Sequence, residues 1–390
     1  MPRLRPFKAL RYPATSGSPG PRLIDDPFAI TDAQRRAWIR DESHLIHLLE
    51  APNPDSVIRR WRDRGALVED AEAAFHVLEV EPAGAKDSRR PAVRYLLGAM
   101  DPREGTQPLE EEPRPIAGGT PLPAVAADDY FVLRRLLKEV STRTPPELEV
   151  RSDGHLLRLW RVTDTTTSLR IVQAMEEVDL RPLGPAPEHG SCLAAVLPLS
   201  DPGLEVRPLH RALKGLETFN AETFLTLVQA YARIYDLEAP LNTEAGLAEA
   251  RDRMATLAAG YHAVLLVLPG GRGKILRFRQ ALELSHIKAV PKNPTLRSLD
   301  LALLNALVLR TVLGIPEPEQ PGHPQVFQHP SLEGLVEQVG SGMFQVGFAL
   351  NPPPLWQIRA VMEAKQRLPS RTFVLDPLPP AGLLFRTPEE

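Results

Sequence analysis

A histidine and an arginine stand together at the end of one expected strand. Residues 204–211 have the sequence LEVRPLHR, so His210 and Arg211 close a short strand-like run. An arginine can bind a carboxylate or phosphate through two parallel hydrogen bonds, and a histidine can carry a proton near neutral pH. The pair is therefore a candidate anion-binding element, although charged residues at a strand end are also often simply solvated.

A glycine-rich segment, GGRGK at 270–274, invites comparison with phosphate-binding loops. Such a loop has the spacing GxxxxGK followed by Ser or Thr, and a helix begins there. Here Leu268 stands at the first glycine position and Ile275 at the hydroxyl position, and a strand is expected to follow. The segment is instead predicted to be the turn of a hairpin between 263–268 and 275–279.

Two histidines, His44 and His47, are three residues apart in the segment SHLIHLLE. On a helix this spacing presents both imidazoles to one metal ion, and Glu42 and Glu50 could join them. The same segment also has the pattern of a half-buried helix with histidines at its polar edge. The second interpretation is preferred, and no metal site is assigned.

The single cysteine, Cys192, excludes an internal disulfide and a zinc site built from several cysteines. It precedes an apolar strand, so it is expected to be a small buried residue rather than a nucleophile.

Charge and composition exclude several classes of protein. The net charge of −3 and the pI near 6.4 argue against bulk electrostatic binding to nucleic acid. The basic N-terminus lacks the apolar region of a secretory signal, and no apolar run is long enough to cross a membrane. A soluble, cytoplasmic protein is expected.

Elements positioning these residues alternate irregularly between helix and strand, which favours an α+β fold of mixed sheets with flanking helices. Thr31 is expected to cap a helix from Asp32, and 205–210 to pair with the strand 193–198. Expected strands are 73–80, 92–100 and a hairpin over 148–164; expected helices are 55–65, 128–140, 168–178, 223–235, 243–258 and 299–313. Three regions follow: an N-terminal α+β lobe (1–125), a central region (126–215) and a C-terminal lobe (216–390).

Several short motifs, in order along the chain, resemble those of the bacterial family catalogued as domain of unknown function 1015. They resemble the family's opening PF.ALRY, its W..G.L..D and LWrvtD segments, its GL.ilPtHR, its LDv..L helix and its closing segment. The matching residues are Pro6, Phe7, 9–12, Trp61, Gly65, Leu67, Asp70, 159–164, Gly203, Leu204, Pro208, His210, Arg211, Leu299, Asp300, Leu304, Gly314, Phe348, Leu350, Pro369, Thr372, Phe373, Gly382 and Leu383.

The departures from the family bear on activity. The family's strongest signature, IADGHHRY, has no counterpart between Asp164 and Gly203, and the expected histidine is missing beside Glu110. That signature resembles an element of ParB- and sulfiredoxin-like nucleotide-dependent proteins, including kinases acting on free serine. The resemblance therefore implies phosphoryl transfer to a small hydroxyl-bearing metabolite, with ATP or ADP and Mg²⁺ as cofactors. A chain without this cluster loses groups which that chemistry needs.

The resulting hypothesis is a divergent homologue of this kinase-like family that is catalytically inactive but retains an anion-binding pocket. The phosphate or carboxylate of a small molecule is expected to be bound by four residues: Arg11, His210, Arg211 and Arg371. One alternative is an active phosphotransferase whose catalytic groups moved to Glu188, His189 or Asp201. Another is a non-enzymatic interaction or regulatory protein whose proline-rich loops contact a protein partner. A ParB-like role on DNA is disfavoured, because neither a basic patch nor a helix-turn-helix pattern is present.

Overall fold

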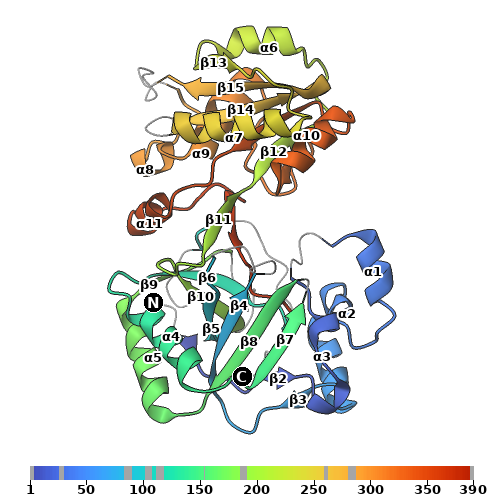
Figure 1. Ribbon diagram of the computed structural model, residues 1–390, viewed down its shortest axis with the longest axis vertical. Coiled ribbons are helices and arrows are strands. Elements are labelled where there is room, and N and C mark those ends of the chain that lie inside the picture. The colour runs from blue at the N-terminus through green and yellow to red at the C-terminus, as the bar shows by residue number, and fades with distance from the viewer. Residues whose placement is uncertain are drawn as a thin grey trace. The chain divides into compact units, whose positions relative to one another are not determined.

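The chain forms two compact units in the computed structural model. Unit 1 comprises Met1–Glu205 with Asp376–Glu390, and unit 2 is Val206–Leu375. The structure describes residues 4–25, 30–82, 90–101, 108–110, 118–152, 154–184, 191–258, 262–279 and 287–386. Each unit is described by itself below, with elements labelled as in Figure 1.

Unit 1 is built on an eight-stranded sheet with the order β7-β8-β4-β5-β10-β6-β9, in which β1 also pairs with β5. The pairs are antiparallel except for β10 with β6. The strands are β1 (Leu4–Arg5), β4 (Phe75–Glu81), β5 (Val93–Met100), β6 (Leu122–Ala127), β7 (Leu148–Ser152), β8 (His155–Val162), β9 (Asp179–Pro182) and β10 (Cys192–Pro198).

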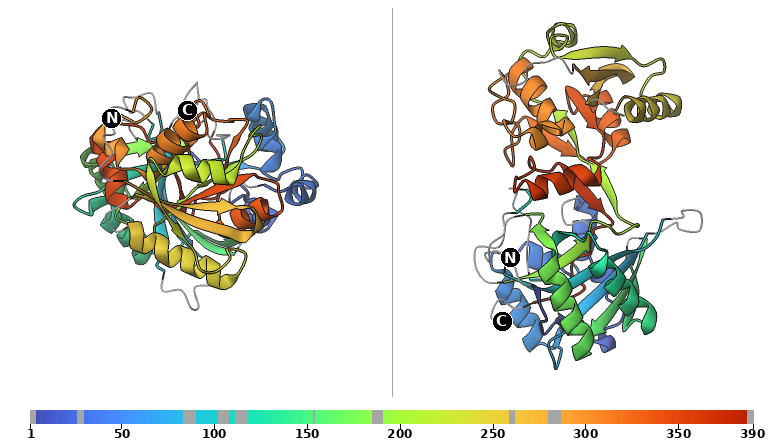
Figure 2. Two further views of the ribbon diagram at one scale, coloured as in Figure 1. Left: turned by 90° about the horizontal axis from the view of Figure 1, so that it is seen from above. Right: turned by 90° about the vertical axis from the view of Figure 1, so that its left-hand side faces the viewer.

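Two amphipathic helices, α4 (Val132–Arg143) and α5 (Thr165–Glu177), cover one face of this sheet (Figures 1 and 2). Leu133, Leu137 and Ile171 are fully buried there against sheet residues such as Val77 and Leu96. Asp164 begins α5 because its carboxylate accepts hydrogen bonds from the backbone N–H groups of Thr166 and Thr167.

A smaller cluster packs the N-terminal helices of unit 1 against its C-terminal segment. Leu10, Ile58 and Trp61 are buried there with Phe385. Thr31 caps the first helix with a complete capping box, as its sequence predicts. The elements are β2 (Leu10–Arg11), α1 (Asp32–Trp38), α2 (Ile46–Leu49), α3 (Pro54–Asp63) and β3 (Val68–Glu69), with short 3-10 turns at Ala14–Ser16 and Gly20–Arg22.

Unit 2 contains a six-stranded antiparallel sheet with the order β13-β15-β14-β17-β12-β16. Its strands are β12 (His210–Leu213), β13 (Ala232–Asp236), β14 (Ala263–Leu268), β15 (Arg272–Phe278), β16 (Val326–His329) and β17 (Val346–Leu350). Its helices are α6 (Ala221–Val228), α7 (Glu244–Ala258), α8 (Pro294–Arg297), α9 (Asp300–Leu303), the π-helical η5 (Leu304–Val312), α10 (Leu332–Gly340) and α11 (Leu355–Glu363).

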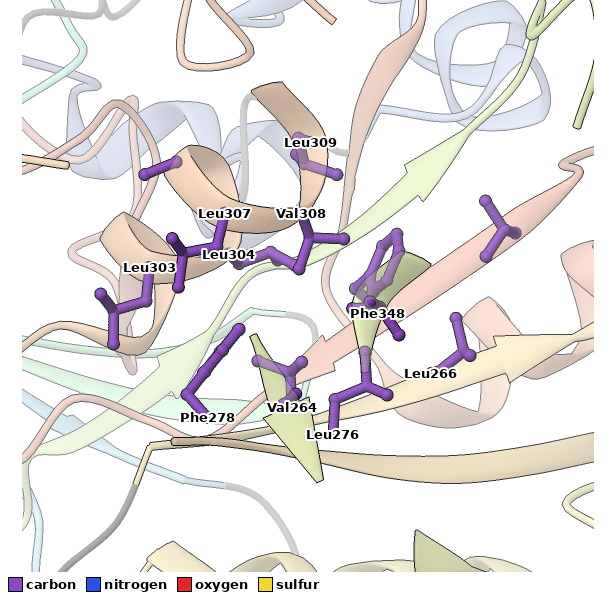
Figure 3. Close-up of a cluster of buried hydrophobic side chains, with 14 of the residues drawn as sticks. Val264, Leu266, Leu276, Phe278, Leu303, Leu304, Leu307, Val308, Leu309 and Phe348 are labelled. Atoms are coloured by element: carbon purple, nitrogen blue, oxygen red, sulfur yellow. The ribbon is translucent and has the colours of Figure 1, made fainter. Parts of the chain in front are cut away.

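The central strand β14 is apolar throughout because both faces of the sheet are covered. Val264 and Leu266 pack with α6, α9 and η5 in one cluster, which Figure 3 shows in close-up. Leu265 and Val267 point to the opposite face and pack with α7 and α10. This alternation fixes the register of β14, and so places the residue before it, His262, at one end of the sheet.

Several sequence predictions are confirmed. The mixed, largely antiparallel sheets with flanking helices make the chain α+β. The predicted hairpin is present: β14 pairs with β15, and Gly270 and Gly271 of the segment GGRGK form the turn, whereas Arg272–Lys274 already belong to β15. The helix expected over 299–313 is present, with π-helical geometry from Leu304, and it ends before Gly314, whose φ of 69° is the left-handed region that favours glycine.

Two predictions of local structure were wrong. Residues 205–208 (β11) pair with β18 (Phe373–Asp376) rather than with the strand 192–198, whose two neighbours are β5 and β6. The helix expected over 223–235 ends at Val228, and Ala232–Asp236 form an edge strand paired with β15. In the second case, sheet pairing outweighs a helical pattern that continues past the end of α6.

The two units also differ from the three regions expected from the sequence. The boundary expected at 125 falls within β6, which lies between β10 and β9 in the unit 1 sheet. The boundary expected at 215 falls ten residues after the observed division at Glu205, since 215 − 205 = 10. The C-terminal residues from Asp376 belong to unit 1, a return that no local pattern in the sequence indicates.

Candidate functional site

Unit 2 contains a cavity of about 430 Å³ at the start of β14 and the end of β17. Pockets of this size accommodate small metabolites. Its polar side chains come from a histidine, an aspartate, an asparagine, a glutamine, a serine and a threonine, and its apolar walls are leucines, three consecutive prolines and a tryptophan. The lining residues are His262, Ser298, Leu299, Asp300, Leu301, Leu350, Asn351, Pro352, Pro353, Pro354, Trp356, Gln357 and Thr372.

A histidine and a carboxylate are in direct contact in this cavity. Nδ1 of His262 lies 2.8 Å from Oδ1 of Asp300, a normal hydrogen-bond distance. The carboxylate can only accept, so Nδ1 donates; in the neutral imidazole the lone pair of Nε2 is then left as an acceptor. The His262 side chain is about one-third exposed and that of Asp300 less so. This arrangement orients an imidazole to take a proton from a bound group.

Regular secondary structure holds both residues of the His262–Asp300 pair, called the dyad below. The carbonyl of His262 accepts a hydrogen bond of 2.8 Å from the backbone N–H of Phe278, which extends the pairing of β14 with β15. Asp300 is the first residue of α9, where a carboxylate is favoured by the helix macrodipole. The two side chains therefore meet because the sheet end and the helix start are adjacent.

Asn351 supplies a hydrogen-bond donor without an acceptor. Its Nδ2 is buried and has no hydrogen-bond partner among the described residues. Leaving such a group unpaired costs roughly 1–3 kcal/mol. Asn351 directly follows β17, and the proline run 352–354 after it restricts the backbone before α11. A ligand acceptor placed in the cavity would satisfy this amide.

Trp356 adds an exposed aromatic ring to the cavity. It lies in the first turn of α11, and 63% of its surface is exposed. The next residue, Gln357, donates a hydrogen bond of 2.8 Å from Nε2 to the carbonyl of Ser298. This bond ties α11 to the end of α8, so the indole is carried by a fixed helix.

Three of the four residues expected to bind an anion lie behind the cavity wall. Nδ1 of His210 accepts a hydrogen bond of 3.2 Å from the backbone N–H of Leu350, a lining residue. Nη2 of the buried Arg211 donates to the carbonyls of Ser370 and Arg371, the two residues before Thr372 in the wall. These contacts bring His210, Arg211 and Arg371 together, and they attach β12 to the segment that lines the cavity.

Arg211 and His210 are both held in structural contacts. Nη1 of Arg211 also donates to the carbonyls of Leu209 and His210, so four backbone oxygens surround its guanidinium. Burial, together with the charges of the nearby His329 and Arg211, lowers the pKa of His210 to about 4. His210 is therefore neutral at pH 7. An anion-binding role for these residues stays a prediction.

The fourth expected residue, Arg11, belongs to unit 1. Its guanidinium pairs with Asp70 at 2.8 Å and with Glu147 at 2.7 Å. Asp70 is buried, with Nε2 of His76 3.7 Å from its Oδ2. Burial raises the pKa of this carboxyl, but the nearby His76 and the charges of Arg11 and Arg161 outweigh burial and hold the pKa below its usual value. Arg11 thus neutralises a buried carboxylate of its own unit.

Other candidates from the sequence have structural contacts. His44 is buried against Trp38, and its Nδ1 accepts from the backbone N–H of Ile46; burial lowers its pKa to about 4. Asp201 accepts the backbone N–H of Gly203 at 2.9 Å, as a turn residue does. Glu188 and His189 lie outside the described residues.

Cys192 is buried at the start of β10, as its sequence context predicts, and burial raises the pKa of its thiol to about 12. Among the described residues, no group of three or more His, Cys, Asp or Glu side chains is arranged to hold a metal ion. No helix in the described part of the chain is long and apolar enough to cross a membrane.

Comparison with protein families gives one match. The model described as "Protein of unknown function (DUF1015)" matches residues 181–302. This match, over part of the chain, is to the family that the motifs resembled. The DUF1015 match covers about a third of the chain, including His210, Arg211, His262 and Asp300; Asn351 and Trp356 lie outside it. A search of curated proteins found no match.

Three solved structures were found, all with low similarity. A free serine kinase variant in complex with AMP has a TM-score of 0.28 and 11% identity, and the alignment covers 65% of this chain and 84% of that one. A second free serine kinase variant, in complex with ADP, has a TM-score of 0.28 and 12% identity, and the alignment covers 65% of this chain and 84% of that one. A conserved hypothetical protein from Pyrococcus furiosus has a TM-score of 0.32 and 12% identity, and the alignment covers 75% of this chain and 94% of that one. Scores this low carry no argument about this chain's fold or activity.

Sequence reasoning identified the wall of the cavity but not its reactive groups. Asp300 and Leu350 were matched as family motif residues, whereas His262 follows no motif and precedes a strand. The contact between His262 and Asp300 joins positions 38 apart in sequence, so no local spacing reveals it. Asn351 and Trp356 flank the proline cluster in the sequence LNPPPLW. This cluster is the signal from which a loop carrying functional groups could have been predicted.

Proposed function

We propose that this protein binds a small, hydroxyl-bearing molecule in the cavity of unit 2, where Nε2 of His262 accepts a hydrogen bond from the ligand's hydroxyl group. The contact of 2.8 Å between His262 and Asp300 is the observation that carries this proposal. A histidine held by a carboxylate is the usual way to orient an imidazole toward a hydroxyl proton. The hydroxyl-bearing metabolite expected from the family resemblance is the class of ligand that such a group would hold.

A nucleoside triphosphate with Mg²⁺ does not fit the cavity itself. Such a complex is held by cationic side chains on its phosphates and by oxygen ligands on the metal. The lining residues include one carboxylate, that of Asp300, and no lysine or arginine. The phosphates would therefore have to lie against residues outside the lining, and Arg371, which precedes Thr372, is the first of the expected anion-binding residues to test.

The proposal is tested by thermal unfolding in the presence of a ligand panel. The panel contains uncharged hydroxyl compounds (adenosine, uridine, ribose, glucose) and charged ones (L-serine, AMP, ADP, ATP, with and without Mg²⁺). A ligand at a hundred times its dissociation constant stabilises the folded state by about 2.7 kcal/mol, which raises Tm measurably. At least one uncharged compound is expected to raise Tm of the wild-type protein.

Two variants test whether the rise in Tm comes from binding in the cavity. His262→Ala removes the proposed acceptor, and Asp236→Asn serves as the control because Asp236 is an exposed carboxylate of unit 2 that pairs with Lys274. The shift should disappear in His262→Ala and persist in the control. A panel without any shift, or a shift that is equal in His262→Ala, would overturn the proposal. Incubation with ATP and each binder then decides between a phosphotransferase and a protein that only binds.

A further inference from the structure

The polar and aromatic groups of the cavity other than the dyad point to one class of ligand. Asn351 has a buried donor without a partner among the described residues, and Trp356 has an exposed indole. The remaining lining consists of leucines, prolines and the uncharged polar residues Ser298, Gln357 and Thr372. Resting on the function proposed above, we infer that the ligand is a nucleoside. Its base stacks on Trp356, and Asn351 hydrogen bonds to the edge of the base. Its ribose hydroxyl faces His262.

The indole of Trp356 favours a flat ring. Stacking of a nucleobase on an aromatic side chain contributes about 1–3 kcal/mol and tolerates any base. An indole that stays 63% exposed on a helix contributes little to the core, so burial does not account for its position. The prolines 352–354 and Leu299 offer apolar surface to the same ring.

The amide of Asn351 favours a base with a neighbouring acceptor and donor. A carboxamide pairs with adenine through its N–H₂ group on N7 and its oxygen on the exocyclic amine. This pairing would supply the acceptor that Nδ2 lacks within the protein. Among nucleosides, adenosine is therefore the best match.

The charge of the lining selects an uncharged ligand. Asp300 is the only carboxylate among the lining residues, and neither lysine nor arginine is present there to neutralise a phosphate. A nucleoside fits a cavity of about 430 Å³, in which a base and a ribose bring a hydroxyl group within reach of a second wall. AMP should bind no more tightly than adenosine.

The test uses the intrinsic fluorescence of the full chain. The four tryptophans are Trp38, Trp61 and Trp160 in unit 1 and Trp356 in unit 2, so difference spectra against Trp356→Phe isolate the cavity signal. Adenosine should change the emission of wild-type protein and leave that of Trp356→Phe unchanged. Calorimetry should still detect adenosine binding to Trp356→Phe, because phenylalanine keeps a stacking ring.

Base recognition is tested by calorimetry with adenosine and 7-deazaadenosine, which lacks the N7 acceptor. Wild-type protein should bind adenosine at least tenfold more tightly than the deaza analogue. Asn351→Leu, a substitution of similar size, should bind both with the same, weaker affinity. Circular dichroism melts of each variant establish that it is folded, and Asn351→Asp provides a second variant that removes the donor but keeps a polar group.

The outcomes separate this inference from the proposed function. A His262-dependent shift with ribose or glucose, without adenosine binding, would overturn the nucleoside inference and leave the function standing. Adenosine binding that changes no Trp356 emission, or that is equal in Asn351→Leu, would also overturn the inference. If no panel compound binds, both fail.

Discussion

Asp300 and His262 form a hydrogen-bonded pair of 2.8 Å although one begins a helix and the other precedes a strand. Each is held by the backbone of its own element, and the two elements belong to the same core of unit 2. The pair is the group that we propose binds the ligand's hydroxyl.

Replacing Asp300 by Asn should weaken ligand binding while leaving the fold intact. The amide can still contact His262, but it no longer fixes the proton on Nδ1, so Nε2 is an acceptor in only part of the molecules. Adenosine affinity is expected to fall about tenfold, or about 1.4 kcal/mol. Calorimetry on Asp300→Asn and on the control Asp236→Asn measures this difference; equal affinities would show that the carboxylate does not orient the imidazole.

Substituting Arg211 should destabilise unit 2. Its guanidinium is buried and donates to four backbone carbonyls. Arg211→Lys keeps the charge but loses the planar fork, and each carbonyl left unpaired costs roughly 1–3 kcal/mol. The expected result is a lower free energy of unfolding in urea.

The matched control is Arg279→Lys, since Arg279 also contacts a carbonyl, that of Gln229, but at the surface. Water can replace the lost donor there, so its stability should change little. Similar losses of unfolding free energy in both variants would mean that the contacts of Arg211 with the carbonyls of Ser370 and Arg371 do not stabilise unit 2.

Acid should destabilise unit 2 through His210. Burial lowers its pKa from 6.5 to about 4, so between these two values the unfolded chain binds a proton that the folded chain does not. Stability contributed by neutral His210 is therefore complete above pH 6.5 and is lost as pH falls toward 4, by about 3 kcal/mol in total.

His210→Asn is the variant that isolates this effect, because its amide oxygen can replace Nδ1 as acceptor for the N–H of Leu350. Urea unfolding at several pH values should show a smaller loss between pH 6.5 and 4 in the variant than in the wild type. Parallel pH curves would assign the acid sensitivity to other groups, such as His44 in unit 1.

Trp356→Ala should leave stability unchanged, whereas Trp61→Ala should reduce it strongly. Trp356 is 63% exposed, while Trp61 is 2% exposed and donates from Nε1 to the carbonyl of Glu42. Truncating a buried tryptophan costs roughly 3–5 kcal/mol. Thermal melts of the two variants provide the comparison. A marked loss in Trp356→Ala would mean that the indole serves the fold.

Much of the fold could be predicted from the sequence where local patterns are strong. The cap at Thr31, the glycine end at Gly314 and the alternation of β14 are signals read within a few residues. The pairing of β11 with β18 and the return of the chain to unit 1 depend on contacts between residues more than 160 apart, since 373 − 208 = 165. No local pattern encodes them.

For the candidate site, too, the features that local sequence patterns indicate could be predicted, and those that depend on distant contacts could not. The family motifs pointed to His210 and Arg211 and to the closing segment from Phe348, which contribute to the cavity wall or contact it. His262 and Asp300 meet only through the packing of α9 against the sheet, and the orphaned donor of Asn351 is visible only once its surroundings are known.

The most direct test is a double-mutant cycle on adenosine affinity with His262→Ala, Asp300→Asn and the two combined. If Asp300 acts only by orienting His262, the double variant should bind no more weakly than His262→Ala, and the coupling between the two positions should equal the effect of Asp300→Asn alone. Additive losses, or affinities equal to that of the wild type, would contradict a binding site built on this pair.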